Sequence, residues 1–162
     1  MKESFYYCDL RWPELKAQAR KKAIVLLPFG QTEEHGPHLP VGTDVFIAEE
    51  TARAIAQKAG PKIPLLVLPA LWCGYSGKDL FKWPGVISMP PETVISVIEN
   101  IGLSLGRSGF RKLVILNAHG HHDAITRVAA RKIGDASDVC VIVSEIWKMA
   151  SEAVARLRRS KT

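Results

Sequence analysis

The stretch "AIVLLPFGQTEEHGPHLPVGTD", residues 23–44, joins an apolar run to a loop rich in carboxylates and imidazoles. Residues 23–30 are apolar and end in Pro and Gly, which is typical of a buried strand in a parallel sheet. The loop that follows supplies five carboxylate or imidazole side chains: Glu33, Glu34, His35, His38 and Asp44. A surface loop needs polarity, but it does not need this selection of metal-binding side chains.

Strand-like apolar runs alternate with helix-like segments along the rest of the chain. We expect strands at residues 23–30, 64–74, 112–120 and 138–147. We expect helices at residues 43–60, 90–110 and 123–136, and a basic helix after residue 147. The order β-α-β-α-β-α-β-α predicts an α/β fold, in which three α/β/α layers enclose a mostly parallel sheet.

Length and composition are those of one soluble globular domain, which we expect to span residues 1–162. Hydrophobic residues make up 47% of the chain and charged residues 23%. No apolar stretch is long enough to cross a bilayer, and the N-terminus has no apolar signal region. Three widely separated cysteines, Cys8, Cys73 and Cys140, read as reduced thiols. We therefore expect a cytoplasmic protein with no membrane partner.

The net charge of +6 arises from 22 basic and 16 acidic residues. Part of the excess lies in two basic runs: Lys16, Arg20, Lys21 and Lys22, and then Arg156, Arg158, Arg159 and Lys161. A basic patch for nucleic acid would have this charge. Neither run has interleaved aromatic residues, and both fit the solvated faces of helices. We do not expect nucleic acid as a partner.

All five histidines of the chain lie in two short segments, residues 31–44 and the sequence "NAHGHHD" at 117–123. Each segment follows an expected strand, and the carboxyl ends of parallel strands meet at one edge of a sheet. Glu, Asp and His together suit a divalent ion such as zinc, manganese or iron(II), and one carboxylate can bridge two ions. The sequence thus predicts a divalent metal site at this edge of the sheet.

Each of these residues also has a simpler interpretation. A loop glutamate is commonly solvated, and only one of Glu33 and Glu34 is expected to point inward. Asp44 begins an expected helix, where a carboxylate interacts favourably with the helix dipole. His38 lies between two prolines and suits a packing role. The joint occurrence of these residues at one sheet edge favours the metal site.

Three segments together resemble the creatininase (creatinine amidohydrolase) family. Residues 27–44 are similar to its signature Pro-x-Gly-Ser-x-Glu-x-His-Gly-Pro-His-Leu-Pro-x-x-Thr-Asp, and "KWPGVISMPPET" (82–93) and "GFRKLVILNAHGHHD" (109–123) resemble two further family segments. The resemblance implies an α/β/α metal-dependent amide hydrolase. Family members continue with His-Ala-Gly and Glu-Thr-Ser segments that have no counterpart here, so we expect the C-terminal part of the family domain to be missing.

The resemblance also implies roles for individual residues. Glu33, Asp44 and His119 would hold one ion, and His35 and Asp44 the other, with Asp44 as the bridge. The further ligand of the second ion in creatininase itself is a glutamate two positions after the histidine that matches His119, and in this chain that position is His121. The sequence leaves open whether His121, His122 or Glu34 returns a proton to the leaving nitrogen. Further departures from the family pattern are Leu80 in place of a histidine and Val86 in place of a threonine.

These features predict a metal-dependent amidohydrolase in which metal-activated water attacks the C–N amide bond of a small cyclic or linear amide. The expected partners are that small-molecule substrate and, by the resemblance, further copies of the chain in a homo-oligomer. The alternative is a non-catalytic metal-binding or interaction subunit derived from the family. A count of bound ions discriminates between them, because two ions per chain support hydrolysis.

Overall fold

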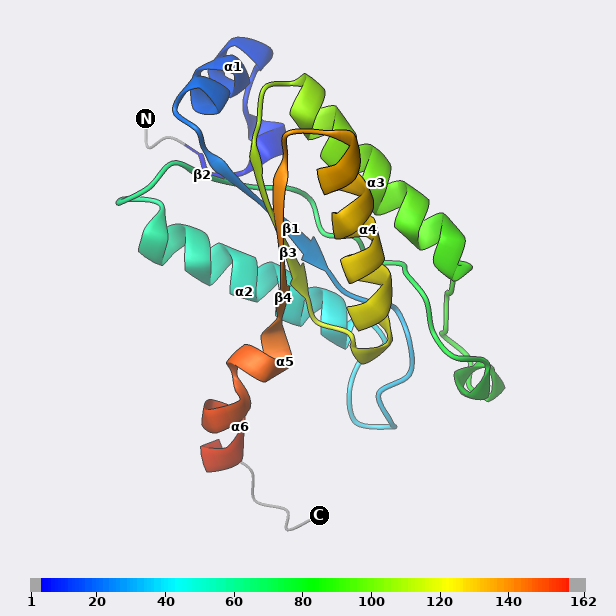
Figure 1. Cartoon of the computed structure of the whole chain (residues 1–162). Coiled ribbons are helices and arrows are strands. Elements are labelled where there is room, and N and C mark those ends of the chain that lie inside the picture. Colours follow the sequence, from blue (N-terminus) through cyan, green and yellow to red (C-terminus); the bar gives the residue numbers. More distant parts are fainter. Residues whose placement is uncertain (1–3, 158–162) are drawn as a thin grey trace.

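Four parallel strands form the centre of the protein in the computed structural model, which describes residues 4–157. They are β1 (Ile24–Phe29), β2 (Leu65–Val67), β3 (Lys112–Asn117) and β4 (Cys140–Glu145), in the spatial order β2-β1-β3-β4. Every pairing is parallel, and helices lie on both faces of the sheet (Figure 1). The predicted three-layer α/β/α architecture is confirmed.

The helices follow the predicted alternation, with one addition before the first strand. They are α1 (Trp12–Arg20), α2 (Thr43–Ala59), α3 (Pro91–Arg107), α4 (Asp123–Ala136), α5 (Ile146–Met149) and α6 (Ser151–Leu157). Three short 3₁₀ helices are η1 (Tyr7–Asp9), η2 (Lys78–Lys82) and η3 (Gly120–His122). In Figure 1, α2 lies on one side of the sheet and α3 and α4 on the other, while α5 and α6 extend beyond the end of β4.

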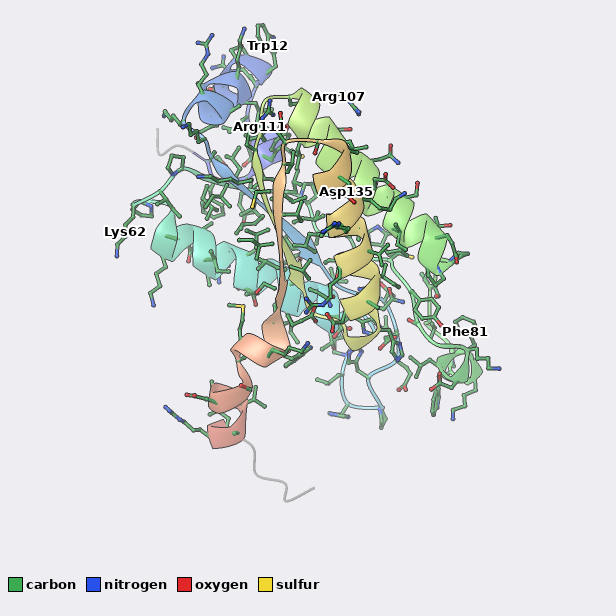
Figure 2. All side chains as sticks on the ribbon, in the orientation of Figure 1. Trp12, Lys62, Phe81, Arg107, Arg111 and Asp135 are labelled. Carbon is green, nitrogen blue, oxygen red and sulfur yellow. The ribbon has the colours of Figure 1, made fainter. Side chains whose placement is uncertain are left out.

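Two hydrophobic cores form because successive residues of a strand point to opposite faces. Leu26 faces α2, whose contribution is the small residues Ala48, Ala52 and Ala56. Val25 and Leu27 face the opposite core, together with buried residues of the other two long helices: Val94, Ile98, Leu105, Ile125, Ala129 and Ile133. Figure 2 shows side chains filling the space between the layers, with Trp12 and Phe81 at the periphery.

The second strand is shorter than predicted. The sequence suggested a strand over residues 64–74, but β2 ends at Val67 because the chain then leaves the sheet through Pro69. Beyond that point Leu71 pairs with the end of β1: its N–H donates to the Pro28 carbonyl (3.0 Å), and its carbonyl accepts from the N–H of Gly30 (2.9 Å). The segment that follows therefore runs along the carboxyl edge of the sheet.

The three longest strands end level with one another. Phe29 of β1 is paired in register with Asn117 of β3, and Asn117 is paired with Glu145 of β4. The loops after these strands therefore start from one edge. This register places the two histidine-containing segments next to each other.

The basic runs lie on the outside of the molecule. Lys16 and Arg20 are exposed on α1, and Arg156 is exposed on α6. The remaining members of the second run, Arg158, Arg159 and Lys161, lie outside the described residues. Among the helices within residues 4–157, none combines the length and apolarity needed to cross a membrane.

We predict that Gly102→Ala destabilises the fold. The packing of α3 on α4 is so close that a Cβ on Gly102 would lie 2.5 Å from Cδ1 and 2.8 Å from Cγ1 of the buried Ile133. Overpacking of this kind costs about 1–3 kcal/mol, which exceeds the gain in helix propensity of about 1 kcal/mol. Urea unfolding measures the change in the free energy of unfolding.

The matched control for this prediction is Gly134→Ala, in the interior of α4. A Cβ at Gly134 would meet no atom within 4 Å, so only the helix propensity changes. This variant should be more stable than the wild type by about 0.5–1 kcal/mol. If both alanines stabilise the protein, the close packing of α3 on α4 is wrong.

Candidate metal centre

The two segments predicted to form a metal site meet at the carboxyl edge of the sheet. The first runs from the end of β1 to the first turn of α2, and the second runs from the end of β3 through η3. Glu33, Asp44 and His119 are buried there, and His35 is partly exposed. Buried carboxylates are rare unless cations or hydrogen-bond donors surround them.

Asp44 lies between two imidazoles. Its Oδ2 is 2.9 Å from Nδ1 of His119, and its Oδ1 is 3.1 Å from Nε2 of His35. The same Nδ1 of His119 is 3.3 Å from Oε1 of Glu33. The carboxylate of Asp44 thus has the geometry of a group that can contact two centres at once.

A close backbone approach brings Asp44 to this position. A Cβ on Gly30 would lie 2.5 Å from Cα of Val45 and 2.7 Å from the carbonyl carbon of Asp44. Only glycine therefore allows the end of β1 to lie against the first turn of α2. Helix α2 is held against the strand end, and its first acidic residue points into the site.

Both ring nitrogens of His35 face oxygen atoms that accept hydrogen bonds. Its Nδ1 lies 3.1 Å from the carbonyl oxygen of Glu33, which only accepts, so Nδ1 carries a proton. Its Nε2 faces a carboxylate oxygen of Asp44, so that atom requires either a second proton or a cation. Burial lowers the pKa of His35, but the Glu33 carbonyl and the Asp44 carboxylate outweigh it, and the pKa is raised.

Two groups of potential ligand atoms converge at this edge. The atoms of Glu33, His35 and Asp44 lie within 4.8 Å of one another, and those of Glu33, His119 and His121 do likewise. Carboxylate oxygens with imidazole nitrogens are the donors that zinc and manganese use in proteins. Nε2 of His119 is buried and has no hydrogen-bond partner among the described residues. The donor set fits one or two divalent ions.

The three residues considered for proton transfer occupy different environments. His121 is exposed, and its Nδ1 accepts a hydrogen bond from the Gly77 N–H (3.3 Å). Glu34 is half-buried and accepts from the Gly36 N–H (2.8 Å), and it belongs to neither group of converging ligand atoms. The exposed His38 also lies outside both groups.

His122 has the environment of a packing residue. It is fully buried, its ring stacks on Phe29 at a centroid distance of 3.9 Å, and its Nε2 accepts the Tyr75 N–H (3.0 Å). Burial, and then the charges of His119 and His121, lower its pKa to about 3. At neutral pH His122 therefore holds no second proton to return to a leaving group.

Residues outside the predicted set also shape the site. Asn117 accepts from the His119 N–H (3.1 Å) and donates to the His119 carbonyl (2.8 Å) and to Oε2 of Glu145 (2.8 Å). Ser76 donates to Oε2 of Glu33 (2.7 Å). Asn117 stands in the segment singled out for its histidines, so its position could have identified it. No sequence pattern pointed to Ser76. It follows the expected strand at residues 64–74, and only the early end of β2 at Val67 brings the segment around Ser76 to the carboxyl edge of the sheet.

The comparisons with known proteins agree with this geometry. The family profile of Creatininase, described as creatinine amidohydrolase, matches residues 8–162. The chain belongs to the creatininase family. The resemblance inferred from the sequence motifs is therefore confirmed over nearly the whole chain.

Three curated relatives illustrate the range of this family. The chain is 27% identical to the 3-dehydro-scyllo-inosose hydrolase of Thermotoga maritima, over 88% of this chain and 44% of that protein. It is 30% identical to the creatinine amidohydrolase of Pseudomonas putida (74% and 46%) and 36% identical to the mycofactocin precursor peptide peptidase of Mycobacterium tuberculosis (64% and 43%). The chain thus spans less than half of the length of these relatives.

Solved creatininases have the same fold. A structure named as creatininase with Mn has a TM-score of 0.83 at 26% identity, covering 96% of this chain and 63% of that chain. A mutant creatininase of Zn-Zn type has a TM-score of 0.85 at 26% identity, covering 99% and 66%. The family fold is therefore present along almost all of this chain.

We predict that His122 makes the fold less stable in mild acid. Its pKa is lowered from 6.5 to about 3, so below pH 6.5 the unfolded chain binds a proton that the folded chain does not. The free energy of unfolding should then decrease as the pH falls, with a slope from this residue of up to about 1.4 kcal/mol per pH unit.

His122→Gln is the variant that isolates this contribution, because an amide oxygen can accept the Tyr75 N–H in place of Nε2. Urea unfolding at several pH values between 6 and 4.5 should give a shallower pH dependence for the variant than for the wild type. Parallel curves would show that His122 is protonated in the folded protein.

Proposed function

We propose that this chain is a metal-dependent hydrolase that acts on the C–N bond of a small amide. The observation that carries the proposal is the buried carboxylate of Asp44, each oxygen of which faces a different imidazole. Two negative groups, Glu33 and Asp44, share this buried space. Burial of such a pair is costly unless positive charge compensates it, and a divalent ion supplies that charge.

The ligands that we propose are those that the family resemblance implies, and their potential ligand atoms converge at the carboxyl edge of the sheet. Glu33, Asp44 and His119 would hold one ion, and His35 with the other oxygen of Asp44 would hold the second. His121 is proposed to complete the coordination, since its ligand atom lies near those of Glu33 and His119. Manganese and zinc are favoured over iron because solved relatives are named for these two metals. When bound, the ions supply Lewis acidity that polarises an amide carbonyl and increases the acidity of water.

The chain's own residues divide the remaining work. An imidazole of His121 that coordinates an ion has no proton to donate, because its Nδ1 already accepts the Gly77 N–H. Glu34, half-buried and outside both groups of converging ligand atoms, is therefore the proposed proton donor to the leaving nitrogen. His122 is assigned to packing beneath the site, since its low pKa keeps it neutral.

The proposed substrate is a small-molecule amide, cyclic or linear. Support comes from the named activities of relatives, which include a creatinine amidohydrolase and a peptide peptidase.

We also propose a cytoplasmic homo-oligomer. Ile142 on β4 is 57% exposed, and Trp147 and Met149 on α5 are 45% and 65% exposed, which supports a protein partner at this side. Light scattering of the purified chain measures the number of copies.

We predict that Glu33→Gln weakens metal binding far more than Glu34→Gln. Glu33 is buried among the converging ligand atoms, whereas the carboxylate of Glu34 accepts the Gly36 N–H outside them. Loss of a charged ligand should increase the Kd for zinc or manganese by at least about 100-fold, the upper end of what loss of a ligand's hydrogen-bond partner costs. Calorimetric titration of each metal-free variant measures its Kd. An equal increase in Kd for the two variants would show that Glu33 was not the right choice of ligand.

We predict that the purified chain binds two ions and hydrolyses an amide only when they are present. Asp44→Asn keeps the shape of the side chain but removes the charge shared by both proposed ions. Its kcat should fall by at least about 100-fold, as when a main electrostatic group is removed from an active site.

The test combines metal analysis with a panel of cyclic amides, formamides and short peptides, assayed with and without added zinc or manganese. Activity that survives complete metal removal would contradict the proposal. A wild-type protein that binds no metal would favour the non-catalytic alternative.

A further inference from the structure

A chain of buried hydrogen bonds reaches the carboxylate of Glu33 from the side opposite His119. Gln31 is completely buried, and Ser76 is 1% exposed. The side-chain amide nitrogen of Gln31 donates to Oγ of Ser76, and the Ser76 hydroxyl lies 2.7 Å from Oε2 of Glu33. The other oxygen of Glu33, Oε1, is the one that lies 3.3 Å from Nδ1 of His119.

The direction of these hydrogen bonds follows from which of the terminal groups can donate and which can only accept. The Gln31 amide oxygen accepts from the Gly74 N–H (2.6 Å), so the amide nitrogen must be the atom that faces Ser76 and the Ile87 carbonyl (3.0 Å). That nitrogen only donates, and therefore the Ser76 oxygen accepts from it. The single proton of the Ser76 hydroxyl is then directed to Glu33, whose carboxylate only accepts.

We propose that Gln31 and Ser76 are positioning residues that hold Glu33 with one oxygen turned away from the metal site and the other presented to it. The inference rests on the proposed metal-binding function. A carboxylate held in this way offers one oxygen to an ion, because the second is already engaged by the hydroxyl. Groups that hydrogen-bond to a metal ligand in this manner commonly change metal affinity by about 10–100-fold.

Gln31 also connects the site to the segment that leaves β2. Its three hydrogen bonds reach the backbone at Gly74 and Ile87 and the side chain of Ser76, all on that segment or on the stretch before α3. In the family signature a serine stands at the position of Gln31. The longer amide of this chain can span the distance to all three partners, so the orientation of Glu33 depends on how that segment is anchored.

The test compares Ser76→Ala with a matched control, Ser88→Ala. Ser88 lies on the same surface of the loop and its hydroxyl accepts the Ser76 N–H (2.9 Å), but it does not contact Glu33. Both variants lose a buried or partly buried hydrogen bond, so both should lower the Tm of the metal-free protein. Only Ser76→Ala should increase the Kd for zinc or manganese, by about 10–100-fold, with Ser76→Thr restoring the wild-type value.

A second variant, Gln31→Glu, is close in shape to the wild type and, when the new carboxyl group is ionised, replaces the amide donor with an acceptor, so metal binding is measured at a pH high enough to ionise it. The Ser76 hydroxyl would then donate to residue 31 and release Glu33, so metal binding should weaken. Added negative charge alone would act in the opposite direction and strengthen the binding of a cation. The sign of the change therefore separates positioning from simple electrostatics, even if Ser76→Ala does not fold.

The visible absorption spectrum of bound cobalt(II) reports on metal coordination and does not depend on the stability of the fold. If Glu33 is released in Ser76→Ala, both of its oxygens can coordinate, and the visible absorption of bound cobalt should change with the coordination number. Ser88→Ala should keep the wild-type spectrum. A wild-type protein that binds no metal would refute the proposed function itself. Wild-type binding with Ser76→Ala and Gln31→Glu within twofold of it would refute the positioning role alone.

Discussion

The level ending of three parallel strands is the constraint on which the site depends. The last residues of β1, β3 and β4 are paired in register: Phe29 with Asn117, and Asn117 with Glu145. The loops that follow these strands therefore begin at the same edge of the sheet. The N–H of Ala118 still donates to the Phe29 carbonyl (2.9 Å), which fixes the two loops one residue beyond the sheet. A shift of register would separate Glu33 from His119. A one-residue shift would also turn the side chains of the shifted strand to the opposite face of the sheet, which would disrupt both cores.

The site carries an electrostatic cost that the surrounding structure offsets in several ways. Glu33 and Asp44 are buried carboxylates, and each is close to a nitrogen of His119. The Ser76 hydroxyl supplies a further donor to Glu33, and the start of α2 places the positive end of a helix dipole near Asp44. These groups are enough to fold the site, yet Nε2 of His35 still faces a carboxylate oxygen. A divalent ion is the simplest group that satisfies this arrangement.

Outside the site, helices cover one face of the sheet well and the other face only in part. Helices α3 and α4 cover the sheet on one face, whereas α2 packs over β1 and β2 and leaves Ile142 of β4 exposed. The curated relatives are more than twice as long as the part that this chain matches. The exposed apolar residues Ile142 of β4 and Trp147 and Met149 of α5 lie along this less covered side of the sheet.

The sequence by itself determined the fold class and the composition of the site. Apolar strands alternating with amphipathic helices predict parallel pairing, and the confinement of five histidines to two segments singled out the two loops that meet at the carboxyl edge of the sheet. The alternation of helices and strands was predicted correctly from the first strand onward, but α1 before that strand was not predicted, and β2 is shorter than its apolar run. Hydrophobicity alone could not show where the strand ends, because apolar residues beyond Val67, such as Leu68 and Leu71, remain partly buried after the chain leaves the sheet.

Only the tertiary structure decided which side chains act on one another. Adjacent histidines, His121 and His122, look equivalent in sequence, but one is exposed at the site and the other is buried against Phe29. The contact between Ser76 and Glu33 spans 43 positions of the chain, and no local pattern encodes it. Burial and hydrogen-bond direction are properties of the packed molecule, since they depend on which segments the register and the close approach at Gly30 bring together.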